Sequence, residues 1–213
     1  MAKDSIARQE ILLHAVIFDI DGTLLESASV DDALYRDAVV AVLGNVRFRA
    51  SLVDYDYVTD AGILAQILED NEITPVSGDI LAIKSHFVTS LRKHISDHGP
   101  FSEVSGAGRI LESFHTSKEH SVAIATGGWR ESAQLKLAAA GLDRFGFPLS
   151  TSDDAFDRKE IMRIALDRLG SDFHSVTYYG DGVWDREASL ELGWQFVAVG
   201  PALGGIRSFD ISQ

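Results

Sequence analysis

The sequence contains no cysteine, only four prolines, and 19 Lys and Arg residues against 32 Asp and Glu residues. The absence of cysteine excludes disulfides and thiol chemistry. No apolar run approaches the roughly 20 residues that are needed to span a bilayer. The opening residues, MAKDSIARQEILLH, lack the long apolar core of a secretory signal peptide. We therefore expect a cytoplasmic protein.

The net charge of −13 is spread along the 213 residues rather than gathered in a tail. An acidic protein repels nucleic acids and anionic membranes, so we expect neither as a partner. It would also repel an anionic substrate, unless a local cation or a metal ion reverses the field. The apolar fraction of 46% is sufficient for one domain of ordinary size with a modest insert.

Short apolar runs, each ended by a glycine-containing turn, predict buried strands of a parallel sheet. They lie at residues 14–20, 121–125, 175–179 and 195–199, with a weaker candidate at 147–151. Helical patterns lie at residues 103–115, 130–140, 158–169 and 184–192, and the last three stop at glycine. This alternation predicts an α/β fold, a Rossmann-like doubly wound parallel sheet.

Residues 27–100 interrupt the alternation, because they contain no convincing buried strand. Helical patterns cover 30–43, 62–70 and 77–98, and Gly99-Pro100 marks the end of the segment. The segment carries six Lys and Arg against eleven Asp and Glu, so we do not expect it to bind nucleic acids. We predict a helical insert at 27–100, and an α/β core formed by 1–26 and 101–213.

Polar residues follow the ends of the predicted strands. In an open parallel sheet, ligands bind beyond the carboxyl ends of the strands, so these residues should meet there. They are Asp19 and Asp21, Thr126-Gly127-Gly128, the basic pair Arg158 and Lys159, and Asp181 and Asp185. Residues i and i+2 of an extended backbone face the same side, so Asp19 and Asp21 can reach one ligand. Clustered acids repel one another unless a hard cation lies among them, and Mg²⁺ is the natural choice.

This set of motifs, in this order, resembles the haloacid dehalogenase-like hydrolase superfamily, and the resemblance covers the whole chain. The matching residues are DIDGT at 19–23, the Thr126-Gly127 turn, the basic pair at 158–159, and GDGVWD at 180–185. The insert matches in position the C1 cap of phosphoglycolate-phosphatase-like and β-phosphoglucomutase-like members. The resemblance therefore implies that 27–100 is an inserted α-helical cap domain and that 1–26 and 101–213 form an α/β catalytic core. The resemblance implies a small phosphorylated metabolite as partner, and we expect a monomer or homodimer.

The resemblance also implies a role for each residue. Asp19 would be the nucleophile that forms an aspartyl-phosphate, and Asp21 would be the general acid and then the base. Thr126, Gly127 and Gly128 would hold the phosphoryl oxygens. The Mg²⁺ site would comprise Asp19, Asp21, Asp181 and Asp185. Dehalogenases of the superfamily lack an acid at the position of Asp21, so its presence favours phosphoryl transfer.

The basic residue departs from the family's usual pattern, in which a lysine is followed by proline, with an apolar residue three positions on. Ile161 lies three residues after Arg158, so Arg158 occupies the place of that lysine and Lys159 the place of the proline. Either residue could neutralise the nucleophile, since Arg binds phosphate in a bidentate way and Lys acts as a point charge. The pattern favours Arg158 and leaves Lys159 open.

The sequence also leaves alternatives open at three residues near these motifs. Trp129 follows the phosphate turn and would either wall the pocket or serve only in packing. Thr59 and Asp60 precede a predicted helix, so they would either cap that helix or meet the substrate.

The function predicted from the sequence is Mg²⁺-dependent hydrolysis of a small phosphate monoester such as phosphoglycolate or a sugar phosphate. A phosphomutase would use the same intermediate and return the phosphoryl group to a second hydroxyl. A signalling receiver module also holds an aspartyl-phosphate, but its nucleophile lies on a later strand and it has no such helical insert. A family member that binds phosphate without turnover is the remaining alternative. The presence of Asp19, Asp21 and Asp181 argues against it.

Overall fold

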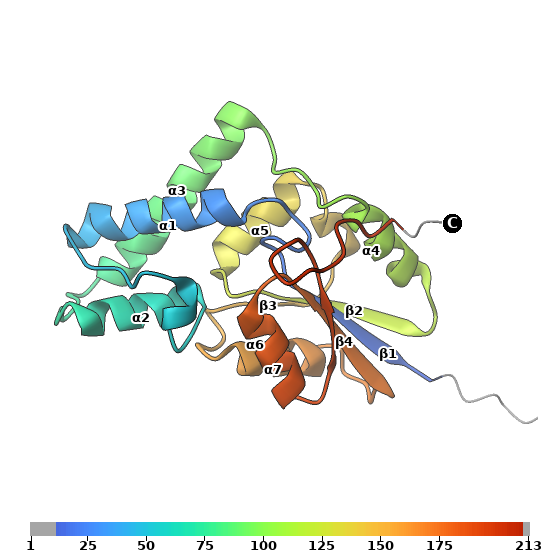
Figure 1. The fold of residues 1–213 in the computed structure, drawn as a ribbon. Coiled ribbons are helices and arrows are strands. Elements are labelled where there is room, and N and C mark those ends of the chain that lie inside the picture. Colours follow the sequence, from blue (N-terminus) through green and yellow to red (C-terminus); the bar gives the residue numbers. More distant parts are fainter. Residues whose placement is uncertain (1–11, 211–213) are drawn as a thin grey trace, which may run out of the picture.

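A computed structural model describes residues 12–210, and the outer ends of the predicted core domain, with most of the opening residues, lie outside this range. Five strands form one parallel sheet in the order β3-β2-β1-β4-β5. The strands are β1 (His14–Phe18), β2 (His120–Ala125), β3 (Leu149–Ser150), β4 (Ser175–Gly180) and β5 (Gln195–Ala198). Figure 1 shows the sheet with helices on both sides, which confirms the predicted doubly wound α/β class.

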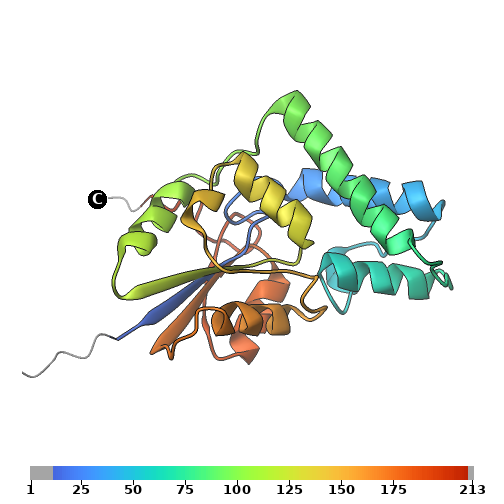
Figure 2. The same ribbon diagram turned by 180° about the vertical axis from the view of Figure 1, so that it is seen from behind.

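Successive residues of β1 point to opposite faces of the sheet and belong to different cores. Val16 and Phe18 join the cluster that includes residues of two helices on one face, whereas Ile17 joins residues of two helices on the other. Figure 2 shows α4 and α5 on one side of the sheet and α6 and α7 on the other. The helices are α4 (Ala107–Thr116), α5 (Arg130–Ala139), α6 (Arg158–Asp167) and α7 (Val183–Glu191), with a short turn η2 (Asp143–Phe145) after α5.

Between β1 and α4 the chain forms a group of helices with a core of its own, which we call the helical insert. It comprises α1 (Ala28–Leu43), η1 (Leu52–Asp54), α2 (Asp60–Asp70) and α3 (Asp79–His98). Tyr35, Ile67 and Phe87 are among the buried side chains of this second core. None of the helices within residues 12–210 combines the length and apolar character that crossing a membrane would require.

Two elements are shorter by three residues or more than their apolar patterns predict. Helix α4 begins at Ala107 rather than at 103, because Gly106 lies at φ +81° and Glu103 pairs with Leu25 in an isolated β-bridge. Val104 is buried all the same, so burial without helix produced the misleading pattern. The weak strand predicted at 147–151 contains only Leu149 and Ser150.

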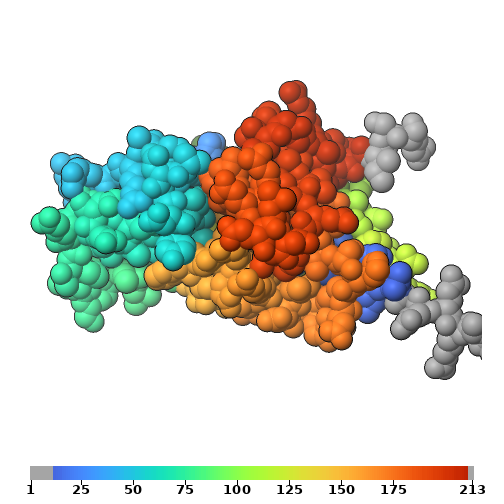
Figure 3. Space-filling view, turned by 60° about the horizontal axis from the view of Figure 1, so that its bottom comes forward, coloured from blue at the N-terminus to red at the C-terminus, as the bar shows by residue number. Residues whose placement is uncertain are grey.

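Trp129 joins the insert to the sheet. It belongs to the turn after β2, yet its ring packs 5.4 Å from that of Tyr35 and 5.9 Å from that of Phe87 in the insert. The backbone N–H of Asp60 donates to the carbonyl of Gly127 at 2.8 Å. Figure 3 shows the insert, coloured blue to green, packed against the rest of the molecule. The insert therefore lies beside the edge of the sheet at which β2 ends.

Candidate active site

The carboxyl ends of β1, β2 and β4 lie level with one another. Phe18 of β1 is in register with Ile124 of β2 and with Tyr179 of β4. The residues that follow these positions, Asp19, Thr126 and Asp181, therefore leave the sheet at one edge. The strand order reverses at β1, since β2 lies on one side and β4 on the other, and such switch points form the crevice where ligands bind.

Three acids meet at this edge. Asp19, Asp181 and Asp185 each offer a carboxylate oxygen, and these oxygens lie within 4.8 Å of one another. Asp19 is 4% exposed and Asp185 is fully buried. Burial, followed by the negative charge of Asp185, raises the pKa of Asp19 well above its usual value, and the same two causes raise the pKa of Asp181 to about 7. The cluster is therefore electrostatically costly on its own.

Arg158, the first residue of α6, supplies positive charge to this cluster. Its Nη1 donates to Asp19 Oδ1 at 3.3 Å, and its Nε lies 3.4 Å from Asp185 Oδ1. Nη2 donates to the carbonyl of Val58 in the insert, at 3.3 Å. Burial disfavours the charged guanidinium, but the nearby acids, Asp185 first, outweigh burial and hold the pKa of Arg158 above its usual range.

Lys159 points away from the cluster. Its Nζ lies 2.6 Å from the carboxylate of Glu191 on α7, and its side chain is 32% exposed. Successive residues of a helix point about 100° apart, so two adjacent basic residues cannot serve one site equally. The structure thus brings Arg158, and not Lys159, to the acids.

The acid cluster fits a hard divalent cation. Asp185 Oδ1 is buried without a hydrogen-bond partner among the described residues, and three carboxylates face one guanidinium. The ion pair with Arg158 offsets part of the charge, but a buried carboxylate oxygen without a hydrogen bond remains costly unless a further cation or donor satisfies it. Carboxylate oxygens are also the ligands that hard cations prefer. Asp19, Asp181 and Asp185 could therefore hold such an ion.

The turn after β2 brings backbone amides and a hydroxyl to the same cavity, which is lined by Thr126, Gly127 and Gly128. Thr126 is 2% exposed, and its Oγ1 accepts from the N–H of Gly128 at 3.2 Å. A Cβ atom at Gly127 would lie 2.7 Å from Arg158 Nη2 and 3.0 Å from the Val58 carbonyl. Glycine is needed there because the arginine and the insert approach the backbone closely.

The family model of haloacid dehalogenase-like hydrolases matches residues 13–193. The chain belongs to this family. No curated protein sequence matches the chain. The match spans strands β1 to β4 of the sheet and the helical insert.

Solved structures share the fold of this hydrolase at low sequence identity. A hydrolase from Pseudomonas syringae has 20% identity and a TM-score of 0.69, covering 87% of this chain and 84% of its own. CbbY from Rhodobacter sphaeroides, in complex with phosphate, has 17% identity and a TM-score of 0.69 over 94% and 90%. A predicted phosphoglycolate phosphatase from Haemophilus somnus has 16% identity and a TM-score of 0.60 over 88% and 85%. At these identities, the likeness shows the fold alone.

In this hydrolase, Asp21 stands apart from the three acids. Both of its carboxylate oxygens accept hydrogen bonds from Lys136 Nζ, at 2.7 and 2.6 Å, and Ser27 Oγ also donates to Oδ1. The sequence analysis did not single out Lys136. Its signal was available, because Lys136 lies on the buried face of α5 with Ser132 and Ala133, where a lysine is unexpected.

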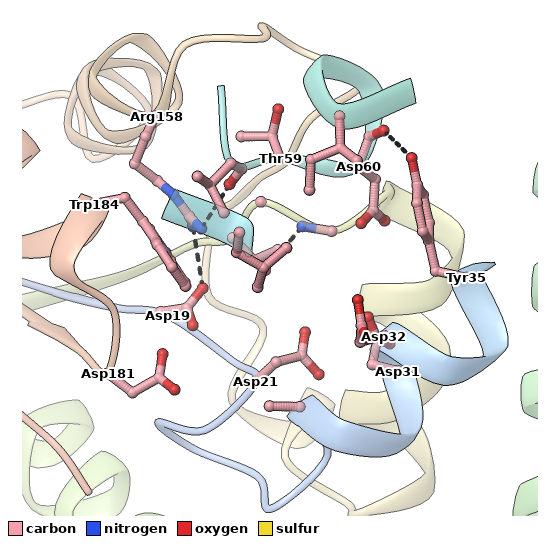
Figure 4. Close-up of a pocket in the computed structure, with 17 residues that line it drawn as sticks. Asp19, Asp21, Asp31, Asp32, Tyr35, Thr59, Asp60, Arg158, Asp181 and Trp184 are labelled. Carbon is pink, nitrogen blue, oxygen red and sulfur yellow. Dashed lines mark hydrogen bonds and ion pairs between the residues drawn. The ribbon is translucent and has the colours of Figure 1, made fainter. Parts of the chain in front are cut away.

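The cavity lined by Asp19, Asp21 and Arg158 has a volume of about 200 Å³, and residues of the insert line it as well. Figure 4 shows Asp31, Asp32, Tyr35 and Asp60 on the side away from Asp181. The structure places the three residues whose roles the sequence left open. Thr59 caps α2 by accepting from Gly62 N at 3.2 Å and also lines the cavity. Asp60 lines the cavity and accepts from Trp129 N, while the Trp129 ring packs in the insert core.

Proposed function

We propose that this hydrolase cleaves a small phosphate monoester through an aspartyl-phosphate on Asp19, with Mg²⁺ as its metal ion. One observation carries the proposal: Asp19, Arg158 and the phosphate turn line the same cavity as Asp181. Family membership supports hydrolysis, and the second acid of the DIDGT motif supports a leaving group that needs a proton.

In the first step, an Asp19 carboxylate oxygen attacks phosphorus, and the bond from phosphorus to the alcohol oxygen breaks. Asp21 gives its proton to the departing alkoxide, and Asp21 is left as a carboxylate. In the second step, Asp21 takes a proton from water, whose oxygen attacks phosphorus. The bond to Asp19 then breaks, inorganic phosphate leaves, and both carboxyl groups return to their starting states.

The other residues hold charge in place during both steps. Thr126 and the amides of Gly127 and Gly128 bind phosphoryl oxygens, and Arg158 offsets the charge on Asp19 and on the phosphoryl group. We assign Arg158 rather than Lys159 to this role because only Arg158 lines the cavity. When bound by Asp19, Asp181 and Asp185, Mg²⁺ supplies positive charge beside the phosphoryl oxygens. We assign Asp21 to proton transfer rather than to the metal site, since Lys136 and Ser27 bind its carboxylate.

The helical insert would serve as the cap domain, residues 27–100, over a core formed by 1–26 and 101–213. A cap that covers the cavity excludes water and limits the size of the substrate. Among the described residues that line the cavity, Arg158 is the one cation, while Asp31, Asp32 and Asp60 line the far side. An alcohol with hydroxyl groups fits these acids better than a carboxylate does, so we favour a sugar phosphate over phosphoglycolate.

The test is a panel of phosphate esters, assayed with and without Mg²⁺, on the wild type and on Asp19→Asn. We expect metal-dependent phosphate release that Asp19→Asn abolishes. Asp97→Asn, at an exposed acid on α3, is the matched control and should keep the activity. Unchanged phosphate release in Asp19→Asn would contradict the nucleophile.

The same panel separates the remaining alternatives. We expect kcat/KM for phosphate esters of uncharged sugars to exceed that for phosphoglycolate, which carries an additional carboxylate. The reverse order would overturn the substrate preference. An isomerised sugar phosphate without net phosphate release would identify a phosphomutase. Binding of phosphate esters without any turnover would identify a phosphate-binding module.

A further inference from the structure

Lys136 is a fully buried cation to which the reaction described above assigns no role. Its side chain has 0% exposure, and it lies on α5, on the face that packs against the sheet. Burying an ammonium group is costly unless it is paired and hydrogen-bonded. An apolar side chain could be buried here without the free-energy cost of desolvating a charge. The presence of a lysine therefore needs an explanation.

All three N–H groups of Lys136 are matched by carboxylate oxygens. Nζ lies 2.7 and 2.6 Å from the two oxygens of Asp21, and 2.6 Å from Oδ1 of Asp31. Asp21 lies in the DIDGT turn after β1, whereas Asp31 lies in the first turns of α1. Lys136 thus joins the candidate acid/base to the beginning of the helical insert.

The surroundings of Asp21 leave its carboxylate little freedom. Lys136 engages both oxygens, and Ser27, which is fully buried, donates to one of them. Figure 4 shows Asp21 between Asp19 and Asp31 at the floor of the cavity. A group that must first give and then take a proton has to keep one orientation toward the substrate oxygen through both steps.

We propose that Lys136 is a positioning residue, which fixes the Asp21 carboxylate toward the leaving-group oxygen by a charge-assisted hydrogen bond to each of its oxygens. Asp31 helps to place the ammonium group, since it accepts the third N–H. The proposal rests on the proposed function, because it assigns the acid/base role to Asp21.

The matched variant is Lys136→Met/Asp31→Asn. With both acids ionised, Lys136, Asp21 and Asp31 carry a net charge of −1, and with Asp21 protonated they carry none; the double substitution keeps either value while it removes the ammonium group. Lys136→Met alone would leave Asp21 and Asp31 without their shared cation and is the variant more prone to misfold. Lys93→Met, at a lysine that is 75% exposed on α3, is the control for loss of a lysine.

The readout is kcat/KM for an alkyl phosphate, which needs a proton on its leaving group, and for an activated aryl phosphate, which does not. We expect Lys136→Met/Asp31→Asn to lose about 100-fold on the alkyl ester and less than about threefold on the aryl ester. Asp21→Ala should show the same selectivity, and adding it to the double variant should cost little more. A folded double variant that loses equally on both esters, or on neither, would overturn the proposal while leaving the phosphatase standing. A wild type that releases no phosphate from any ester would overturn both.

A rescue experiment covers the case in which the double variant does not fold. The chain has no cysteine, so Lys136→Cys can be alkylated in denaturant with 2-bromoethylamine and refolded, with wild type carried through as control. The product places an ammonium group at nearly the position of Nζ. We expect alkylation to restore the alkyl-ester activity to within about tenfold of refolded wild type. Refolded, alkylated protein that keeps the selective defect would refute the positioning role.

Discussion

Arg158 and Lys159 are adjacent in the sequence, yet they occupy different environments. Asp157 caps α6, and from this start Arg158 turns toward Asp19 while Lys159 turns toward Glu191. The sequence pattern could favour one residue but could not decide between them, because the deciding quantity is the direction of the first turn of the helix. Cap geometry sets that direction, and tertiary packing sets the cap.

The two residues provide a matched pair of substitutions. We expect Arg158→Met to lower kcat by about 100-fold or more, because it removes a cation beside the nucleophile and the phosphoryl group. Lys159→Met should retain activity to within about twofold, since it removes only a partly exposed ion pair. Steady-state kinetics on one sugar phosphate measures both values. Comparable losses in the two variants would contradict the assignment.

At the scale of elements, the strands of the sheet were predictable from the sequence, but the start of α4 and the orientation of α5 were not. The runs at β1, β2 and β4 are apolar because both faces of a parallel sheet are covered, and their ends therefore indicated the site. A lysine on the apolar face of α5 was a signal in the sequence, but its pairing with Asp21 depends on α5 facing the turn after β1, which no local pattern encodes. The start of α4 was misplaced because Val104 is buried outside any helix.

Asp154 makes several of the contacts that hold the loop between β3 and α6. Its carboxylate accepts from Arg168 Nη2 at 2.7 Å and from the N–H of Thr151 at 2.9 Å, and it also pairs with Arg130. Burial raises the pKa of Asp154, but the hydrogen bond from Arg168 and the other contacts outweigh burial and lower it to about 2. Asp154 therefore ties together the beginning of α5, β3 and the residue that follows α6.

We expect Asp154→Asn to lower the free energy of unfolding at pH 7 by about 1–2 kcal/mol, through lost charge-assisted hydrogen bonds. The folded-state pKa is depressed below the usual 3.8, so this stability is present above about pH 4 and is lost as the pH falls toward 2. Urea titrations from pH 7 to pH 3 measure the difference from wild type, which should shrink at low pH. Asp172→Asn, at an exposed acid after α6, is the control. A difference that is independent of pH would contradict the ion-pair explanation.

At the scale of the whole molecule, insert and sheet are two cores that share the residues around the cavity. Trp129 lies in the insert core, and the side-chain hydroxyl of Thr59 donates to the carbonyl of Phe156 at 2.9 Å. The position of the insert along the chain was predictable from the missing strand. Its placement over the cavity was not, because it depends on such contacts between residues far apart in sequence.

The molecule also brings three acids together at the candidate active site. Within an overall charge of −13, Asp19, Asp181 and Asp185 are brought together and are paired mainly with Arg158. Because the pKa of Asp181 is raised to about 7, we expect the contribution of Asp181 to the stability of the metal-free protein to fall as the pH rises from about 4 through 7. A divalent cation that binds only the folded state would restore that stability.

We therefore expect Mg²⁺ at about 100 times its dissociation constant to stabilise the wild type by about 2.7 kcal/mol, which is about 5–10 °C in Tm for a chain of this size. Asp181→Asn at pH 8 should abolish this shift, and in EDTA it should melt above the wild type, because it removes a repelling charge. Thermal melts at matched ionic strength measure both effects, with Asp97→Asn as the control for a lost surface acid. If Asp181→Asn kept the full Mg²⁺ shift, the ion would bind elsewhere on the acidic surface. If Asp181→Asn had a lower Tm than the wild type in EDTA, the charge of Asp181 would not destabilise the metal-free protein.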